Sequence, residues 1–184
     1  MKNVALTGLS RSGKDSVAAR LVEHHGYVRV AFADRLKEAA LKADPIIHQT
    51  TGAAGWVDQR LSDIVRLYGW EAAKDLFPEV RRFLQEYGQT VREIGPYFWI
   101  QAATPAVQAA WDDGRPVVFT DVRYLNEAET LEVWGFDIVR VTRPGQTPGA
   151  HVSERQMLAY PADRAIVNDG SLEDLAALAD TLTA

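Results

Sequence analysis

Residues 3–16 read NVALTGLSRSGKDS, and this stretch decides the fold. The run NVALTG (3–8) is short, apolar and β-favouring, and it ends in glycine, which is typical of a buried strand. The run DSVAARLVEHH (15–25) has apolar residues at helical spacing and is followed by Gly26, a common helix-ending residue. A strand, a glycine-rich turn and a helix therefore follow one another directly.

The turn between this strand and this helix matches most of a phosphate-binding loop, G-x-x-x-x-G-K followed by Ser or Thr. Gly8, Gly13 and Lys14 occupy their positions. The backbone N–H groups of residues 9–14 can wrap a phosphate, and Lys14 can reach the β- and γ-phosphates of ATP. The predicted ATP contacts are therefore Ser10, Arg11, Ser12, Gly13, Lys14, Asp15 and Ser16. The alternative is a glycine-rich turn that binds nothing.

The loop departs from the general pattern at its end. Asp15 stands where a hydroxyl that contacts Mg²⁺ is expected, and Ser16 follows one residue later. A carboxylate beside a phosphate repels it unless a cation lies between them, so we expect Asp15 or Ser16 to help hold Mg²⁺, directly or through water. Asp15 also complements the dipole of the helix that it opens, which is the alternative explanation.

The segment PVVFTDVR (116–123) places Asp121 at the end of a second strongly β-favouring run. In open parallel sheets, ligands bind at the carboxyl ends of the strands, and an acidic residue there can hold Mg²⁺ through water. Arg123 lies two residues further on and is a candidate phosphate ligand. The alternative for both residues is an ion pair at the surface.

Strands and helices alternate along the chain, which predicts an α/β protein with a five-stranded parallel sheet and helices on both faces, a P-loop three-layer sandwich. The predicted strands are 3–8, 27–32, 116–122, 137–143 and 164–168, and the predicted helices are 15–25, 35–43, 58–67, 70–76, 79–94, 98–114, 125–134, 153–159 and 172–182, with a break or late start at Pro105 in the sixth. Residues 44–57 and 144–151 are predicted loops. We expect a single domain, 1–184.

The composition is that of an ordinary globular protein, with 47% hydrophobic and 24% charged residues in 184. A net charge of -5 argues weakly against duplex nucleic acid as a partner, and the absence of cysteine excludes disulfides and thiolate chemistry. No apolar run approaches the roughly 18 residues of a membrane span, and MKNVALTG shows no signal peptide. We expect a cytosolic protein without a membrane partner.

The stretch 34–113 is too long for one crossover connection, so we expect an inserted helical lobe that binds a second ligand. Asp34 is predicted to cap the helix that follows it, and Lys37 in its first turn is a candidate phosphate ligand or simply a solvated lysine.

One helix of this lobe, 79–94, carries a polar stripe. Arg82, Gln85 and Arg92 fall on one face, away from an apolar stripe at 3–4 spacing, and would suit the phosphate and base edge of a nucleotide. A solvated helix face is the alternative. Trp99, just beyond this helix, is a candidate for stacking on a base, with core packing as the alternative.

Residues 143–155 form a predicted lid loop with two prolines and two glycines, flanked by Arg143, His151, Glu154 and Arg155. Such a loop could close over a triphosphate and exclude water, and arginine suits the charge on a transferring phosphoryl group.

Seven segments together resemble the deoxynucleoside monophosphate kinases of bacteriophages: GLSRSGKDS, AFADRLKEA, FLQEYGQTVREI followed by FW, FTDVRYLNEAE, VTRPG, HVSE and IVNDGSLEDL. The Lys-Asp-hydroxyl ending of the phosphate loop is similar to that family. The resemblance implies transfer of the γ-phosphoryl group of ATP to a deoxynucleoside 5′-monophosphate with Mg²⁺, acceptance of several bases, and location in the host cytoplasm if a phage encodes the chain.

The motifs and the resemblance together predict roles for particular residues. Catalytic roles fall to Lys14, Asp121, Arg143 and Arg155, with Asn168 added to the ATP contacts; the substrate contacts are Asp34, Lys37, Arg82, Gln85, Arg92, Trp99, Arg123 and Glu154; the metal contacts are Asp15, Ser16 and Asp121. Two alternatives stay open: another small-molecule phosphate kinase, such as a phosphomevalonate kinase, and a nucleotide-binding module without transfer activity. The apolar helical insertion could support a homodimer.

Overall fold

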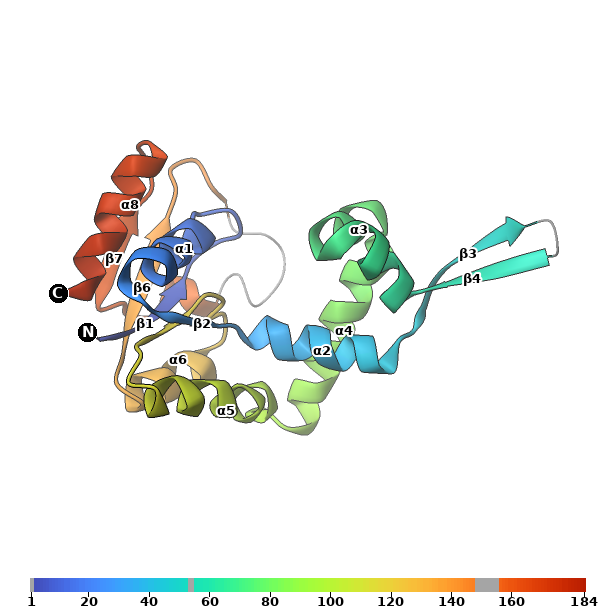
Figure 1. Cartoon of the computed structure of the whole chain (residues 1–184), viewed down its shortest axis with the longest axis horizontal. Coiled ribbons are helices and arrows are strands. Elements are labelled where there is room, and N and C mark those ends of the chain that lie inside the picture. Colours follow the sequence, from blue (N-terminus) through green and yellow to red (C-terminus); the bar gives the residue numbers. More distant parts are fainter. Residues whose placement is uncertain (1, 53–54, 148–155) are drawn as a thin grey trace. The chain divides into compact units, whose positions relative to one another are not determined.

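The computed structural model of the chain describes residues 2–52, 55–147 and 156–184. The chain divides into two compact units (Figure 1). Met1–Phe32 and Ile100–Ala184 together form the first, which we call the sheet unit, and Ala33–Trp99 forms the second, which we call the helical unit.

The sheet unit contains a five-stranded parallel sheet. Its strands are β1 (Asn3–Thr7), β2 (Val28–Val30), β5 (Val117–Phe119), β6 (Phe136–Thr142) and β7 (Arg164–Val167), in the order β2-β5-β1-β6-β7. Neighbouring strands pair in parallel throughout this order. The predicted α/β fold with a five-stranded parallel sheet is confirmed, and β1, which leads into the glycine-rich turn, is its central strand.

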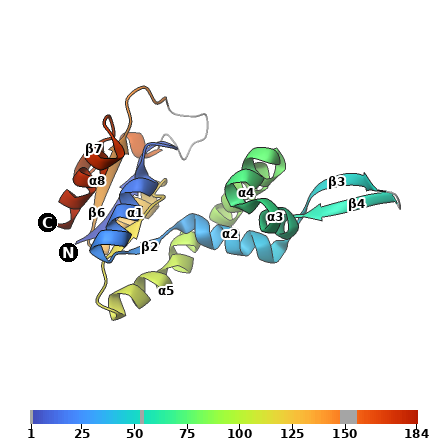
Figure 2. The ribbon, with the colours of Figure 1, turned by 45° about the horizontal axis from the view of Figure 1, so that its top comes forward.

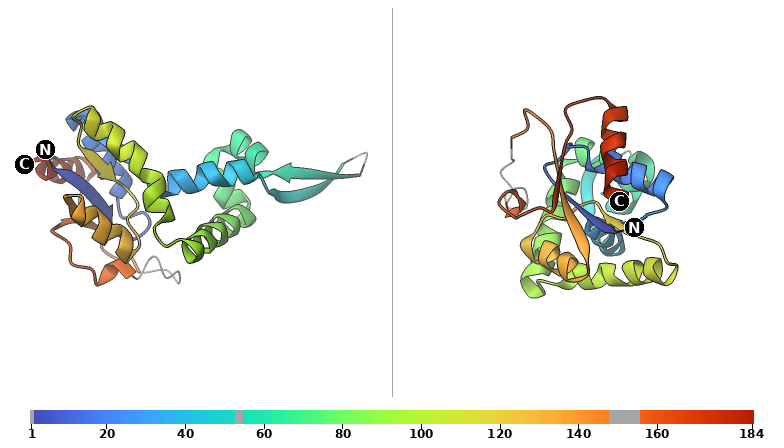
Figure 3. Two further views of the ribbon diagram at one scale, coloured as in Figure 1. Left: turned by 90° about the horizontal axis from the view of Figure 1, so that it is seen from below. Right: turned by 90° about the vertical axis from the view of Figure 1, so that its left-hand side faces the viewer.

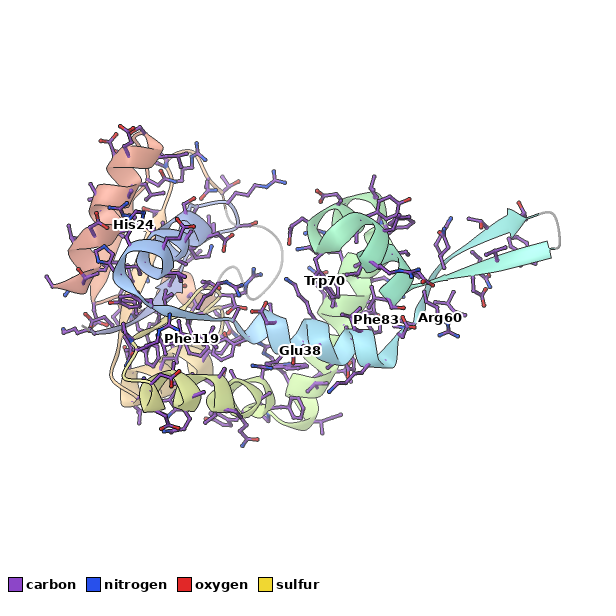
Figure 4. The ribbon with its side chains drawn as sticks, in the orientation of Figure 1. His24, Glu38, Arg60, Trp70, Phe83 and Phe119 are labelled. Carbon is purple, nitrogen blue, oxygen red and sulfur yellow. The ribbon has the colours of Figure 1, made fainter. Side chains whose placement is uncertain are left out.

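Helices cover both faces of this sheet (Figure 3). Helices α1 (Lys14–His25) and α8 (Leu172–Asp180) lie on one face, and α5 (Phe98–Asp112) and α6 (Leu125–Val133) lie on the other. The short 3₁₀ helices η1 (Gln156–Leu158) and η2 (Thr181–Thr183) complete the unit. Side chains alternate along β1, so that Val4 and Leu6 join the core beneath α1 and α8. Phe119 on β5 is fully buried (Figure 4).

An ion-pair cluster joins α1 to α8 at the surface of the sheet unit. The Arg20 guanidinium donates two hydrogen bonds of 2.8 Å to the Asp180 carboxylate, and His25 Nε2 lies 2.6 Å from Asp180 Oδ1. These hydrogen bonds, Arg20 first, hold the pKa of Asp180 well below its usual range. A capping box of Ser171 and Asp174 starts α8.

Helix α5 runs through Pro105 without a break, so the predicted interruption there is wrong. Proline removes one backbone donor from a helix interior. Ala103 and Val107 on either side are fully buried, and this tertiary packing outweighs the local cost.

The helical unit contains more than helices. It comprises most of α2 (Phe32–Ala43), then β3 (Ile46–Gly52), β4 (Gly55–Arg60), α3 (Leu61–Leu76) and α4 (Pro78–Ile94). The predicted loop 44–57 is wrong, because β3 and β4 form an antiparallel hairpin that projects from the helices of this unit (Figure 2). The β-branched residues of IIHQTTG favour a strand, a signal that the nearby glycines and threonines obscured.

Helix α3 starts with a cap supplied from a distant residue. Asp44, in the left-handed region with φ 42°, accepts a 2.8 Å hydrogen bond from the Ser62 N–H through its carboxylate. Arg60, which lies where the hairpin joins α3, donates to the Asp44 carbonyl at 2.8 Å (Figure 4). The Ser62 hydrogen bond lowers the pKa of Asp44. The helix therefore begins at Leu61, three residues later than predicted from residue 58.

The break predicted between the helical stretches 58–67 and 70–76 exists as a kink at Gly69, whose φ of 72° and ψ of 166° are not helical. Around this kink the helices of the unit pack on their own core. Its buried members are Ala40, Ile47, Leu61, Ile64, Ala73, Val80 and Leu84. Trp70 and Phe83, labelled in Figure 4, pack against this core. The predicted apolar stripe on α4 is right at Val80 and Leu84, but Ile94 at its end is exposed.

Candidate functional site

The glycine-rich turn sits between the carboxyl end of β1 and the first turn of α1, and its backbone requires glycine at two positions. Gly8 has φ 142°, and a Cβ added there would lie 2.1 Å from the Val141 carbonyl oxygen. Gly13 has φ 109°, and its Cβ would lie 2.6 Å from Asn168 Nδ2. Both glycines therefore allow the loop to pack closely against the ends of β6 and β7.

The Lys14 ammonium lies over the loop that precedes it. Its Nζ donates to the carbonyl oxygens of Gly8 at 2.9 Å and Leu9 at 2.7 Å, and lies 3.4 Å from Ser12 Oγ. Ser12 itself is fully buried. The charged end of the predicted catalytic lysine is thus held at the loop where a phosphate group would sit.

Two side-chain amides hold other carbonyls of the loop. Gln146 Nε2 donates to the Ser10 carbonyl at 2.9 Å, and Asn168 Nδ2 donates to the Ser12 carbonyl at 2.9 Å. The Asn168 N–H in turn donates to the Thr142 carbonyl at 2.8 Å, which fixes Asn168 at the end of β7. Asn168 was predicted as an ATP contact, whereas Gln146 was read only as part of a loop.

A cavity of about 230 Å³ adjoins the loop within the sheet unit. It brings together Ser10, Arg123 and Arg143, three residues predicted for the site from separate segments. The complete lining is Thr7, Gly8, Leu9, Ser10, Val122, Arg123, Arg140, Val141, Thr142, Arg143, Gln146, Met157 and Leu158. The carboxyl ends of β1 and β6 and the segment after β5 thus share one concave surface.

Asp121 lies two residues beyond β5, at the same carboxyl edge of the sheet. Its Oδ1 accepts a 3.0 Å hydrogen bond from the Phe32 N–H, at the first residue of α2. The predicted capping role of Asp34 is wrong, because α2 begins at Phe32 and Asp34 falls inside its first turn. The carboxylate that holds the start of this helix comes from Asp121, a long-range partner that no local pattern indicates.

Glu127 orients the segment that follows Asp121. This carboxylate is 2% exposed and accepts hydrogen bonds from the backbone N–H groups of Arg123 at 2.9 Å and Tyr124 at 3.1 Å. It therefore fixes the backbone from which the exposed Arg123 side chain extends. Glu127 lies in the predicted helix 125–134, and three-residue spacing from Tyr124 was too weak a capping signal to single it out.

Arg140 lines the cavity but serves the fold. Its guanidinium donates to the carbonyl oxygens of Met157, at 3.0 Å, and Tyr160, and so ties η1 to β6. The Tyr160 hydroxyl donates to Glu132 at 2.7 Å. Burial, followed by this hydrogen bond, raises the pKa of Tyr160.

In the helical unit, the predicted polar stripe of α4 is engaged in ion pairs. The Arg82 guanidinium bonds to both Glu79 and Glu86, and these partners raise its pKa. Arg82 and Gln85 line a surface hollow of about 400 Å³ together with Lys74, Asp75, Pro78 and Arg81. A phosphate would have to displace a carboxylate to reach Arg82. Arg92, which is half-buried, lies ten residues further along the same helix.

Two tryptophans of this unit are engaged by its own residues. Trp99 is 3% exposed, donates from Nε1 to the Gly88 carbonyl at 3.1 Å, and packs edge-on against Tyr87. Its predicted role in base stacking is therefore wrong, because its faces are buried in the core. Lys37 lies with its ammonium 5.6 Å from the centre of the Trp70 ring.

Comparison of the sequence with known proteins identifies a family. Residues 73–178, more than half of the chain, match the family described as Deoxynucleotide monophosphate kinase. The chain belongs to this family. The predicted resemblance is confirmed, and the protein is a kinase that acts on nucleotide substrates.

Three viral proteins are similar to this chain. An uncharacterised protein of Ictalurid herpesvirus 1 is 29% identical over 92% of this chain and 72% of its own length. A protein of Acanthamoeba polyphaga mimivirus, provisionally named a deoxynucleotide monophosphate kinase, is 27% identical over 93% and 90%. The deoxynucleotide monophosphate kinase of Escherichia phage RB69 is 30% identical over 52% and 41%.

Two solved structures are also similar. A sugar kinase from a Janibacter species is 14% identical, with a TM-score of 0.49, over 98% of this chain and 93% of its own. A protein of Thermus thermophilus is 21% identical, with a TM-score of 0.38, over 100% and 98%. Both TM-scores are below 0.5, so the fold is assigned from the five-stranded parallel sheet of this chain alone.

The possible metal donors of the kinase are all oxygen atoms. Asp15 and Ser16 are exposed in the first turn of α1, and Asp121 is half-buried at the end of β5. Within residues 2–52, 55–147 and 156–184, no group of three or more acidic or histidine side chains forms a metal site. Mg²⁺ fits this donor set, because it usually takes one or two carboxylates and completes its shell with phosphate oxygens and water.

The structure describes the predicted lid loop, 143–155, only as far as residue 147. Arg143 is exposed and lines the cavity beside the phosphate loop. Glu154 and Arg155, together with His151, lie outside the described residues, so their predicted roles stay predictions. Among the helices that the structure describes, none has the length and apolar character of a membrane span.

Proposed function

We propose that the protein transfers the γ-phosphoryl group of ATP to a deoxynucleoside 5′-monophosphate, forming the diphosphate and ADP with Mg²⁺. The observation that carries this proposal is the phosphate loop with Lys14 at its mouth, in a chain of the deoxynucleotide monophosphate kinase family. In this reaction an oxygen of the acceptor phosphate forms a bond to the γ-phosphorus, and the bond from that phosphorus to ADP breaks.

The donor end of the reaction is assigned to the sheet unit. The backbone N–H groups of residues 9–14 and the N-terminus of α1 favour negative charge, and Lys14 adds a full positive charge. Arg143 borders the adjoining cavity and is the cation proposed to face the moving phosphoryl group. Arg155, which lies outside the described residues, is proposed for the same role from the sequence alone. Phosphoryl transfer requires mainly positioning and charge stabilisation, which these residues can supply.

The attacking group needs no general base. A phosphate oxygen of the acceptor is already ionised at neutral pH, so the protein has only to place it in line with the γ-phosphorus. Histidine in a base position is therefore unnecessary.

The acceptor end is assigned to the helical unit, with Arg123 of the sheet unit. Asp34, Lys37, Gln85 and Arg92 are the proposed contacts, and Arg82 joins them only if Glu79 or Glu86 releases it. Glu154, which lies outside the described residues, is proposed from the sequence alone. Trp99 is no longer a candidate, since its ring is buried.

Mg²⁺, when bound with ATP, would neutralise phosphate charge and orient the β- and γ-phosphates. Asp121, Asp15 and Ser16 are the residues that would hold it, directly or through water. The phage and virus relatives further favour action in the cytoplasm of a host cell.

A coupled assay of ADP release tests the proposal. Purified protein with Mg-ATP is given dTMP, dGMP, dCMP or dAMP, and phosphomevalonate in a parallel reaction. We expect turnover with one or more of the deoxynucleotides and none with phosphomevalonate. Activity with phosphomevalonate alone would contradict the proposal and would favour the alternative that the protein is a phosphomevalonate kinase. Binding of ATP without binding of any deoxynucleotide would favour the non-catalytic module.

A further inference from the structure

We propose that Gln146 is a positioning residue for the phosphate donor: its amide holds the Ser10 carbonyl and so keeps the phosphate loop in the shape that binds ATP. The inference rests on the proposed function, because it concerns the same phosphate loop. It adds a residue that neither the motif nor the predicted lid roles include.

The first step of the argument concerns the carbonyl groups of the loop. An anion site needs N–H groups on its inner side and carbonyl oxygens turned away, since a carbonyl dipole repels phosphate oxygens. The Gly8 and Leu9 carbonyls accept from Lys14, and the Gly13 carbonyl accepts from the Val17 N–H within α1. These three are therefore fixed by the loop and its own helix.

The carbonyls of Ser10 and Ser12 are held by residues far along the chain. Asn168 binds the Ser12 carbonyl, where the loop is also clamped by the close packing of Gly13. Gln146 binds the Ser10 carbonyl, at the exposed tip of the loop. Arg11, which follows Ser10, has φ 61°, a left-handed backbone that is costly for a residue with a side chain. The tip thus combines a strained backbone with a hydrogen bond from outside the loop.

The orientation of the Gln146 amide supports this dependence. Its Oε1 is buried and, among the described residues, has no hydrogen-bond partner, while its Nε2 makes the 2.9 Å bond to Ser10. Turning the amide over would bring one oxygen against another. A buried acceptor without a partner is costly, so the bond to Ser10 has to offset that cost.

The backbone around Gln146 is arranged as a turn. Gly145 has φ 79°, and the Gln146 N–H lies 3.4 Å from the Arg143 carbonyl. This turn follows β6 directly and carries Arg143 at its start, beside the cavity. One short turn therefore supplies both the clamp on the loop tip and an arginine at the adjoining surface.

The test replaces the amide with a side chain of the same length that cannot donate, Gln146→Met. The matched control is Gln101→Met, the same change at an exposed position on α5. Binding of Mg-ATP is measured by titration calorimetry, KM and kcat by the coupled assay, and the unfolding temperature by calorimetry. We expect Gln146→Met to raise the Kd for ATP about tenfold, equivalent to about 1.4 kcal/mol.

The remaining readouts separate positioning from general damage. We expect kcat, the KM for the deoxynucleotide and the unfolding temperature of Gln146→Met to stay close to those of the wild type, and Gln101→Met to change nothing. An unchanged Kd for ATP would overturn the inference. So would an equal loss of ATP affinity, deoxynucleotide affinity and unfolding temperature, because that pattern indicates a structural role. A wild-type protein that binds ATP but transfers no phosphoryl group would refute the proposed function alone, since ATP binding still reports on Gln146.

Discussion

Glycines with a positive φ have different surroundings in the two units of this kinase. In the sheet unit, the phosphate loop is packed against the ends of neighbouring strands so tightly that a methyl group added at Gly8 would overlap the Val141 carbonyl. In the helical unit, Gly69 also has a positive φ, but nothing lies within 4 Å of a Cβ added there. The first glycine serves close approach between distant segments, and the second serves a local bend.

The two units also differ in the contacts that hold their proposed binding residues. Two carbonyl groups of the phosphate loop are held by residues far apart in sequence, Ser10 by Gln146 and Ser12 by Asn168. In the helical unit, the polar face of α4 pairs with itself at three- and four-residue spacing. Long-range contacts fix the proposed donor site, whereas the proposed acceptor contacts on α4 lie on a locally paired surface.

The largest expected effect comes from alanine at Gly8, with alanine at Gly69 as the comparison. Gly8→Ala combines backbone strain with overlap against a backbone oxygen, and we expect it to destabilise the protein by about 2–6 kcal/mol and to abolish ATP binding. Gly69→Ala meets open space, so only the cost of a positive φ remains, about 1–2 kcal/mol. Denaturant unfolding and ATP titration measure both. Equal destabilisation by the two variants would contradict the distinction between packed and local glycines.

Truncation of a core leucine in each unit tests whether a loss of stability in the helical unit also lowers ATP affinity. Leu21 and Leu61 are fully buried in the cores of the sheet unit and the helical unit, and truncation to alanine should cost about 2–5 kcal/mol in each case. We expect Leu61→Ala to spare ATP affinity at a temperature where the protein stays folded, because the phosphate loop belongs to the other unit. A loss of ATP affinity in Leu61→Ala that matches its loss of stability would show that the units do not act separately.

The variant Trp99→Phe tests whether Trp99 packs in the core or stacks on the base of the deoxynucleotide. The change removes the indole N–H that bonds to the Gly88 carbonyl, and we expect a loss of stability of about 1 kcal/mol. The KM for the deoxynucleotide should stay within about twofold, because a buried ring does not stack on a base. Steady-state kinetics provide the check, with Trp111→Phe, at a partly exposed position of the sheet unit, as the control. A large rise in that KM with unchanged stability would restore the stacking role.

The smallest expected effect is a pH-dependent one in the sheet unit. Asp180 has a lowered pKa in the folded protein, so its contribution to stability is fully present above the unfolded carboxyl pKa of about 3.9 and is lost as the pH falls toward the folded value. We therefore expect Asp180→Asn to lower the unfolding temperature slightly at pH 6 and to match the wild type more closely as the pH falls below about 4.

The control for this measurement is Asp169→Asn, which alters an exposed aspartate outside the cluster with Arg20 and His25. It should leave the unfolding temperature unchanged. A difference between Asp180→Asn and the wild type that grows as the pH falls would have the wrong sign for a lowered pKa.

The parts of the fold that could be predicted are those with local signals. β1, the glycine-rich turn and α1 follow from an apolar run, two glycines and helical spacing, and the parallel sheet follows from the alternation of elements. The hairpin of β3 and β4 was missed because its strands are largely exposed and mix Thr, Gly and Gln with few apolar residues. The start of α3 was missed because its cap, Asp44, lies outside the helix.

The same distinction between local signals and long-range contacts applies to the residues of the candidate site. Gly8, Gly13 and Lys14 are readable from spacing, and Asp121 and Arg123 from their place at a strand end. Gln146 and Glu127 could not be found this way, because each acts through a backbone group whose position only the folded chain determines.

Transfer of label from [γ-³²P]ATP tests the central claim most directly. Wild-type protein and Lys14→Met are incubated with Mg²⁺ and each deoxynucleoside monophosphate, and the products are separated by thin-layer chromatography. The account predicts labelled deoxynucleoside diphosphate from the wild type and a rate at least about 100-fold lower from Lys14→Met. No labelled diphosphate from an ATP-binding wild type, or equal transfer by Lys14→Met, would contradict it.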